Sequence, residues 1–409
     1  MEATMSSSTT KGIGNVHSHQ INQNCLPKCI MSQQSRLPVW LLKSGILDIL
    51  GGRHAREFFG LMKSEDLQKV AETQAAHMDE AERIDYSIVL TLDFKFARRT
   101  AEEEKDNYAK IIIETAEASA QFPFRFFPFF CYDPRRKEAR ELLEEAVCQL
   151  GYVGIKMYPA TGFDPRPHKD ASLEPPPAGV SIKDNLTALY EFAKKKDLPI
   201  ITHCSPGGSY KCLVDRRKKY KAIWRFTEPS NFLEIAHQYG LRICFAHMGG
   251  KVDHRTQKEM ATQWHNQIIN LIRYSNSWNS EGRFYADQSY GISHVINKKN
   301  KRRLHIENTK RHLDDPAEDK YLLFGTDWPL GLYKYTEKNY LDNYRGEKGL
   351  TPEQQNKYFS DNIARFLFGE SKQIRPEYIR YLEKQKAAEG QTVDIPPWVK
   401  KEDNSYYLS

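Results

Sequence analysis

Short apolar runs that end in polar, glycine or proline positions recur along this chain. After the first run, they follow one another at intervals of about 30 to 50 residues, the length of a strand plus a helix and its return loop. Continuous apolar stretches such as IVLTL and ICFAH are typical of a parallel sheet that is buried on both faces. The eight predicted strands cover residues 12–17, 86–93, 124–133, 153–159, 199–204, 241–248, 283–289 and 321–327.

Segments with apolar residues at helical spacing lie between these strands. Residues 101–120 are the clearest case, with acidic residues in the first turn. Eight strands alternating with helices predict an α/β fold, a (β/α)8 or TIM barrel. A doubly wound sheet is the alternative, but no glycine-rich phosphate-binding motif follows any predicted strand. The other predicted helices cover residues 135–150, 183–196, 229–240 and 256–274.

Three segments lie outside this repeating pattern. Residues 20–84 form an extended first crossover, and residues 160–182 form a long, proline-rich loop after the fourth strand. Long loops without secondary structure often serve as lids over active sites. Residues 371–409 are expected to form one helix and an extended tail. We therefore expect a barrel domain over residues 1–370 and a helical C-terminal extension over residues 371–409.

Composition narrows the class of protein. Hydrophobic residues make up 40% and charged residues 28% of the 409 positions, which is enough to bury a large core. No window reaches the ~18 apolar residues of a membrane span, and the N-terminal sequence has no apolar signal core. Seven cysteines at irregular spacings favour a reducing compartment over a disulfide framework. These observations predict a cytoplasmic protein without a membrane partner.

The net charge of +7 comes from two short segments. Residues 211–225 and 298–312 each hold seven basic residues and one acidic residue, and elsewhere acidic residues slightly outnumber basic ones. Such segments attract phosphate, nucleic acid or other acidic ligands, but they are more often solvated helix faces or loops.

Polar residues of the metal-binding types end several predicted strands. His17 and His19 are two positions apart, so both point to the same face of the first strand. His203 ends the fifth strand and Asp327 ends the eighth. In a barrel, the carboxyl ends of the strands meet around one mouth. Although each residue alone is more often structural, the combination predicts a site for Zn²⁺ or another divalent first-row ion.

Other polar side chains at this end are candidates for catalysis or substrate binding. Lys156 ends the fourth strand and His247 ends the sixth. A buried lysine without a partner is costly, which disfavours an uncharged role for Lys156. The candidate substrate-binding residues, each of which could instead cap a helix or lie on a solvated surface, are Asp93, Tyr158, Arg166, Lys211, Arg216 and Arg217.

Seven motifs together resemble the amidohydrolase superfamily of metal-dependent barrel enzymes. The resemblance covers about residues 12–370, and the branch it is most similar to contains aminocarboxymuconate-semialdehyde-decarboxylase-type proteins and related hydrolases. The motifs specify the superfamily more closely than any one reaction. They are VHSH, VGIKMYPATGF, PIITHCSPGG, ICFAHMGG, FYADQSY, LLFGTDWPL and DNIARFLFG.

The resemblance implies a ligand set. In this superfamily the first-strand histidines, the fifth-strand histidine and the eighth-strand aspartate bind the metal, and here they match His17, His19, His203 and Asp327. The sixth-strand His247 would bind a second metal or activate water. If Lys156 is carboxylated, as in binuclear members, it bridges two ions; in mononuclear relatives it contacts substrate or is structural. The resemblance therefore implies one or two ions, Zn²⁺ first and Mn²⁺ second.

The implied reaction is hydrolysis of a C–N or C–O bond in a carbonyl compound such as an amide, cyclic amide or lactone. A bound ion lowers the pKa of water, and Asp327 could then accept its proton with help from His247. A non-oxidative, metal-dependent decarboxylation of a carboxylated ring or enal is the alternative. The substrate is expected to be small and could be anionic, and family members often form homo-oligomers.

Two further interpretations are weaker. A metal-dependent nuclease or phosphoesterase could use the basic segments, but no aromatic residues are regularly interleaved with them for base stacking. A non-catalytic interaction protein is disfavoured because every expected ligand position is occupied.

Overall fold

The computed structural model describes most of the chain. The described residues are 11–25, 29–31, 36–38, 53–81, 83–97, 107–173, 175–205, 225–250, 255–278, 282–291, 299–331 and 335–409.

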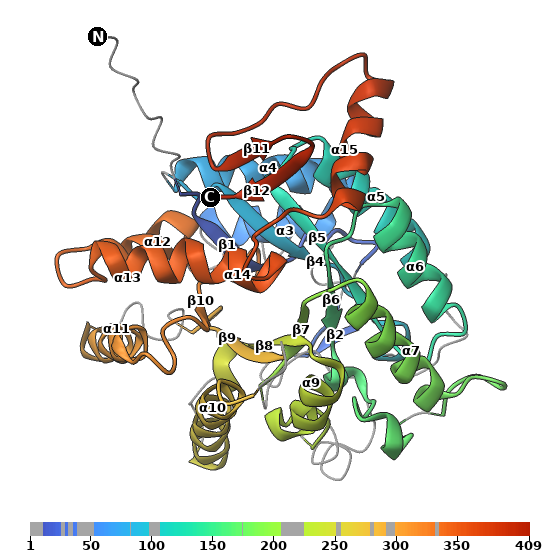
Figure 1. The fold of residues 1–409 in the computed structure, drawn as a ribbon, viewed down its shortest axis with the longest axis horizontal. Coiled ribbons are helices and arrows are strands. Elements are labelled where there is room, and N and C mark those ends of the chain that lie inside the picture. The colour runs from blue at the N-terminus through green and yellow to red at the C-terminus, as the bar shows by residue number, and fades with distance from the viewer. Residues whose placement is uncertain are drawn as a thin grey trace.

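An eight-stranded parallel sheet curls into a nearly closed barrel at the centre of the fold (Figure 1). The strands follow one another around the barrel in chain order. The first and last meet where Val16 N donates to Phe324 O at 2.9 Å and Asp327 N donates to His17 O at 2.8 Å. The predicted (β/α)8 barrel is confirmed. Its strands are β1 (Gly14–Ser18), β4 (Tyr86–Leu90), β5 (Phe126–Tyr132), β6 (Gly154–Met157), β7 (Ile200–His203), β8 (Arg242–Ala246), β9 (Arg283–Asp287) and β10 (Leu322–Leu323).

Helices connect successive strands along the outside of the barrel (Figure 1). The extended first crossover contains the hairpin β2 (Cys29–Met31) and β3 (Arg36–Pro38), followed by two helices, α3 (Arg53–Lys63) and α4 (Leu67–Glu80). Five of the later helices lie where apolar periodicity predicts them, apart from residues 101–106, which fall outside the described part. They are α5 (Tyr108–Ala120), α6 (Ala139–Gln149), α7 (Ile182–Lys195), α9 (Leu233–Tyr239) and α10 (Arg255–Ser275). Four more helices were not predicted, namely α11 (Lys299–Asp314), α12 (Glu337–Arg345), α13 (Pro352–Asn356) and α14 (Asn362–Phe368).

Seven of the eight barrel strands end earlier than predicted, whereas β1 extends one residue further, to Ser18. In β8 and β10 the polar residues at the predicted ends leave the hydrogen-bond ladder. β8 ends at Ala246, and His247 opens a short turn with φ 62°. β10 ends at Leu323, and Asp327 also has φ 62°. Residues other than glycine rarely adopt this left-handed backbone, and such positions cluster at functional sites. Both side chains are therefore held in uncommon conformations at the barrel mouth.

The long loop after β6 packs closely to the barrel at its start. Its residues from Pro159 to Asp164 are buried, and it contains two 3-10 turns, η2 (Pro159–Thr161) and η3 (Pro167–Lys169). Tyr190 donates its hydroxyl to Pro165 O at 2.7 Å, and Arg135 donates to Thr161 O at 3.2 Å. This first half is packed against the barrel, and carbonyl groups in and just after it are bonded to neighbouring elements.

The C-terminal extension contains the predicted helix, α15 (Pro376–Ala388), but its tail is not simply extended. It forms an antiparallel hairpin of β11 (Val399–Glu402) and β12 (Ser405–Leu408). Tyr406 packs on Phe124 with ring centroids 5.7 Å apart, and a Cβ on Gly12 would lie 2.7 Å from Trp398. The tail therefore covers the barrel end at which β1 and β5 begin. No described helix has the length and apolar character needed to cross a bilayer.

Candidate metal centre

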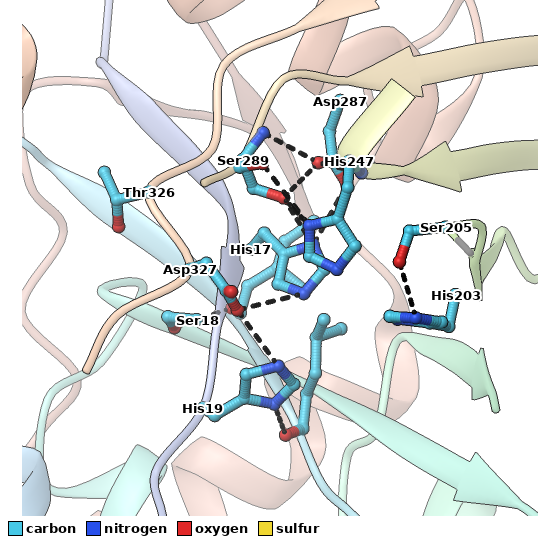
Figure 2. A network of polar contacts seen from close by, with 12 residues as sticks. His17, Ser18, His19, His203, Ser205, His247, Asp287, Ser289, Thr326 and Asp327 are labelled. Atoms are coloured by element: carbon cyan, nitrogen blue, oxygen red, sulfur yellow. Dashed lines mark hydrogen bonds and ion pairs between the residues drawn. The ribbon is translucent and has the colours of Figure 1, made fainter. Parts of the chain in front are cut away.

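Two imidazoles and one carboxylate meet at the carboxyl end of β1. Asp327 Oδ1 lies 3.5 Å from His17 Nε2 and 3.4 Å from His19 Nε2. One ligand atom from each residue lies within 4.8 Å of the others, and all three side chains are buried. Figure 2 shows both rings directed at the Asp327 carboxylate. The three residues come from the two strands whose contact closes the barrel.

The partners of Nδ1 determine where each ring carries its proton. His19 Nδ1 lies 2.9 Å from the carbonyl oxygen of Leu90, which can only accept a hydrogen bond. His17 Nδ1 lies 3.0 Å from Asp287 Oδ2, also an acceptor when ionised. A neutral ring with its proton on Nδ1 presents a lone pair at Nε2. Both Nε2 lone pairs therefore face the lone pairs of Asp327.

This arrangement fits a bound cation. No described residue hydrogen bonds to the buried His17 Nε2 or Asp327 Oδ1. Burial, followed by the charge of Lys156, lowers the pKa of His17 to about 3, so its ring is neutral at neutral pH. Burial would raise the pKa of Asp327, but the nearby His19 and His17 outweigh it and lower the pKa to about 2. Two neutral imidazoles and a carboxylate are ligands that suit Zn²⁺, Mn²⁺ and related ions.

Asp287 and Ser289 orient His17 and His247 through contacts with the Nδ1 atoms of the two rings. Ser289 Oγ hydrogen bonds to Asp287 Oδ1 and lies 3.1 Å from His17 Nδ1 and 2.9 Å from His247 Nδ1. His247 Nδ1 also lies 3.3 Å from the carbonyl oxygen of Ser289, which places its proton on Nδ1 and leaves Nε2 free to accept. Burial would raise the pKa of Asp287, but His17 and these hydrogen bonds keep it well below its usual range.

His17, His247 and Asp287 also have ligand atoms within 4.8 Å of one another. However, His17 Nδ1 already hydrogen bonds to Asp287, and His247 Nδ1 and the Asp287 carboxylate hydrogen bond to Ser289. Carboxylates that bond to the second nitrogen of a metal-binding histidine orient the ring and raise its basicity. We therefore interpret these residues as ones that orient a metal ligand by hydrogen bonding, and not as a separate metal site.

His203 lies beside the three converging ligands and outside their group. Its ring centroid is 5.0 Å from that of His247 and 4.6 Å from that of Tyr158. Its Nε2 lies 3.1 Å from Ser205 Oγ (Figure 2). A role for His203 as a further ligand therefore stays a prediction.

Lys156 faces the same region from β6. It is 1% exposed, and its Nζ lies 6.0 Å from the centre of the Tyr158 ring. Burial lowers its pKa, while the charges of Asp287 and Asp327 oppose that shift. No described carboxylate lies within ion-pair distance of Nζ, so the two aspartates act on Lys156 through space.

A second polar network lies behind the junction of β1 and β10. Asn15 Oδ1 accepts hydrogen bonds from His17 N at 3.1 Å and Thr326 N at 3.0 Å. Glu337 Oε1 accepts from Asn15 Nδ2 at 3.1 Å and Thr326 Oγ1 at 2.8 Å. Glu337 is buried, and burial raises its pKa to about 7. These bonds fix the backbone that carries His17 and Asp327.

Two predicted substrate-binding residues already have protein partners. Asp93 accepts from Arg136 Nη2 at 2.9 Å and from Lys95 N at 3.0 Å. Arg166 donates to both Asp164 oxygens, at 2.9 and 2.6 Å, and its side chain is 29% exposed. Lys211, Arg216 and Arg217 lie outside the described residues. Most of the other basic segment, residues 298–312, forms the exposed face of α11.

The sequence interpretation placed Asp287 at a strand end but gave it no role, and it missed Ser289, Asn15 and Glu337 as parts of this site. Asp287 and Ser289 are two positions apart at the end of β9, the same spacing that indicated His17 and His19. That spacing was a usable signal. Glu337 gave no signal in the sequence, because only the fold brings α12 against β1.

Comparisons with known proteins agree with this architecture. The amidohydrolase family profile matches residues 52–369, as the sequence motifs predicted. Among curated proteins, no sequence matches the chain. A 5-carboxyvanillate decarboxylase from Novosphingobium aromaticivorans, with bound manganese and 3-methoxy-4-hydroxy-5-nitrobenzoic acid, has a similar fold (TM-score 0.50, 13% identity, covering 88% of this chain and 98% of that one).

Two other solved structures are comparable in coverage. A 2,6-dihydroxybenzoate decarboxylase complexed with 2,6-dihydroxybenzoate has TM-score 0.49 and 18% identity over 88% of this chain and 99% of that one. A putative 2-pyrone-4,6-dicarboxylic acid hydrolase from Pseudomonas putida has TM-score 0.48 and 10% identity over 88% and 99%.

Proposed function

Because the chain belongs to the amidohydrolase family of enzymes, we propose that it is a metal-dependent hydrolase of a C–N or C–O bond in a small carbonyl substrate. The observation that carries this proposal is the convergence of His17 Nε2, His19 Nε2 and Asp327 Oδ1, two of which have no other partner among the described residues. When bound there, a divalent ion supplies a Lewis acid that polarises a carbonyl group and lowers the pKa of water.

The protein groups around this point provide the proton transfers that hydrolysis needs. His247 Nε2 is free because Ser289 holds the proton on Nδ1. Burial lowers the pKa of His247, so the ring is neutral and can accept a proton at neutral pH. In our proposal, water attacks the carbonyl carbon, its proton passes to His247 or Asp327, and the proton then reaches the leaving nitrogen or oxygen as its bond to carbon breaks.

We further propose that the substrate carries a carboxylate that Lys156 binds. A buried ammonium is costly, and an anionic substrate offers it a direct partner. The names of the similar proteins support this choice, since two were solved with ring carboxylic acids and a third is described as a dicarboxylic acid hydrolase.

Decarboxylation of a carboxylated ring is the second candidate. The charges of Asp287 and Asp327, which act on Lys156 through space, favour it, because the loss of a substrate carboxylate as CO₂ would relieve its repulsion by them. Atoms and charge balance in this reaction if the ring carbon takes a proton as CO₂ leaves.

Metal content and product analysis test both candidates. Elemental mass spectrometry of the purified protein should find bound Zn²⁺ or Mn²⁺, and His17→Ala and Asp327→Ala should lose an ion while keeping a folded barrel. The metal-loaded enzyme is then offered carboxylated lactones and cyclic amides, and separately hydroxybenzoic acids, with CO₂ measured directly. Ring opening without CO₂ supports hydrolysis, CO₂ release supports the second candidate, and full activity of either metal-ligand variant would reject a metal-dependent reaction.

A further inference from the structure

A second group of histidines lies outside the barrel, between α10 and α11. His265 belongs to α10 and His312 to the last turn of α11. Their ring centroids are 5.4 Å apart, with an angle of 50° between the ring planes. Figure 1 shows α10 outside β8 and β9 and α11 outside β9 and β10, both in the helical layer around the barrel. None of the proposed chemistry uses this pair.

His312 has a hydrogen-bond partner at Nδ1 but none at Nε2 among the described residues. Its Nδ1 hydrogen bonds to Glu318 Oε2, a carboxylate that accepts, so the neutral ring carries its proton there. Its Nε2 is buried, and no described residue hydrogen bonds to it. The side chain is only 7% exposed. A buried acceptor without a donor is unfavourable, so this lone pair needs a ligand.

Glu318 is itself held firmly. Arg273 Nε donates to Glu318 Oε1 at 2.7 Å, and Arg273 Nη2 donates to Asp315 Oδ2 at 2.7 Å. A carboxylate bonded to one nitrogen of a histidine, with the other nitrogen open, is the outer-shell arrangement typical of metal-binding imidazoles. It fixes both the ring orientation and the proton position before any ion arrives.

We propose that His265 and His312 bind a divalent transition-metal ion between α10 and α11. With metal–nitrogen distances of about 2.0–2.1 Å and tetrahedral angles, two imidazoles on one ion have centroids about 5.2 Å apart, close to the separation here. His305 Nε2 lies 2.9 Å from the hydroxyl of Tyr344, so we assign that nitrogen to Tyr344 and not to the ion. Water completes the coordination.

The surroundings select the kind of ion. Burial lowers the pKa of His265 to about 4, with smaller contributions from His312 and Arg311, so the ring is neutral and its nitrogens can bind a metal. Arg311 and Arg273 offset the negative charges of Glu318 and Asp315. An ion between His265 and His312 would therefore be held mainly by nitrogen lone pairs and not by negative charge. Such a site favours Zn²⁺, Cu²⁺ or Ni²⁺ over Ca²⁺ and Mg²⁺.

Calorimetric titration of the full-length protein with Zn²⁺ tests this site. The His17→Ala variant, which has lost a ligand at the barrel mouth, should still bind an ion, and adding His265→Ala or His312→Ala should weaken that binding at least tenfold. Glu318→Gln should weaken it about 10–100-fold. His168→Ala is the matched control, since that imidazole is 53% exposed and belongs to neither group. Unchanged binding in both His265→Ala and His312→Ala would overturn the proposal.

A spectroscopic measurement covers the case in which these variants fold poorly. One equivalent of Cu²⁺ added to a variant without the ligands of the barrel mouth (His17→Ala, His19→Ala and Asp327→Ala together) should give an electron paramagnetic resonance signal with superhyperfine splitting from two imidazole nitrogens. A copper signal without nitrogen splitting would contradict the site directly. Either result leaves the proposed reaction at the barrel mouth untouched, because the two sites share no residue.

Discussion

His17 donates from Nδ1 to Asp287 Oδ2 across 3.0 Å, and both side chains are completely buried. This single contact fixes the ring orientation and leaves Nε2 facing Asp327. One ring nitrogen cannot both donate a proton to Asp287 and bind an ion. The bond from Nδ1 to Asp287 therefore leaves Nε2 as the nitrogen available to an ion. Asp287 therefore acts on the metal through His17.

Replacing this aspartate should weaken metal binding without removing a ligand. In Asp287→Asn the acceptor for His17 Nδ1 loses its charge, so the imidazole becomes less basic and its proton less well fixed. Outer-shell changes of this kind cost about 10–100-fold in metal affinity. We expect that loss for Zn²⁺ in competition titrations with a chelating dye.

The control for this variant is Asp197→Asn, which removes an aspartate paired with Arg242 at 2.6 Å at the opposite end of the barrel. It should leave Zn²⁺ affinity unchanged. Equal affinities for Asp287→Asn and wild type would mean that the contact with His17 is only structural.

Glu337 should make stability depend on pH in a recognisable way. Burial raises its pKa from 4.5 to about 7, so the folded protein binds a proton that the unfolded chain releases between these values. The stabilisation linked to this proton is complete below pH 4.5 and is lost as pH rises through 7. A shift of this size corresponds to about 3 kcal/mol.

Urea unfolding of metal-free protein at pH 5 and pH 8 measures this effect. Glu337→Gln keeps the shape of the side chain but cannot ionise, so its stability relative to wild type should increase from pH 5 to pH 8. Glu353→Gln, whose side chain is 81% exposed, is the control and should follow wild type. If the free energy of unfolding changes equally in Glu337→Gln and wild type between pH 5 and pH 8, the Glu337 carboxyl group does not cause the pH dependence.

The sequence predicted the barrel well because each strand and helix has its own local pattern. All eight strands lie where apolar runs occur, although Asp327 and His247 turn out of their strands into left-handed backbone. Periodicity cannot show that turn, since it depends on contacts with neighbouring strands. The C-terminal hairpin was missed for a similar reason, because Tyr406 and Trp398 become buried only against the barrel.

The candidate site was predictable only in part. His17, His19 and Asp327 converge as strand ends in a barrel should, and their residue types already indicated a metal. The exact neighbours of each ring were not predictable from strand order alone. His203, a predicted metal ligand, lies against Ser205, and Asp93, a predicted substrate-binding residue, accepts from Arg136. Local packing determines which polar side chains at the strand ends remain available to bind an ion or a substrate.

Chelation should destabilise the protein through the site at the barrel mouth. A ligand that binds only the folded state stabilises it by about 2.7 kcal/mol at 100 times its Kd. Thermal unfolding should therefore shift upward with Zn²⁺ and downward with a chelator. The measurement is made in His312→Ala, so that an ion between α10 and α11 does not contribute.

In that background, His19→Ala and Asp327→Asn should abolish the Zn²⁺-dependent shift. His237→Ala, an exposed imidazole on α9, should keep it. A full shift in His19→Ala would exclude this histidine from the ligand set.

Lys156 allows the strongest distinction between a substrate anchor and a bridge between two metals. As an anchor, its ammonium contacts only the substrate carboxylate, so Lys156→Met should raise KM for a carboxylated substrate at least tenfold and change metal content little. As a carboxylated bridge, it holds a second ion, so Lys156→Ala should lose that ion and recover part of its activity with added short carboxylic acids. Elemental analysis of both variants, beside KM and kcat with and without acetate, separates these outcomes. We expect the first, because Lys156 is buried and no described carboxylate lies within ion-pair distance of its Nζ, so a substrate carboxylate would supply the direct partner of the ammonium.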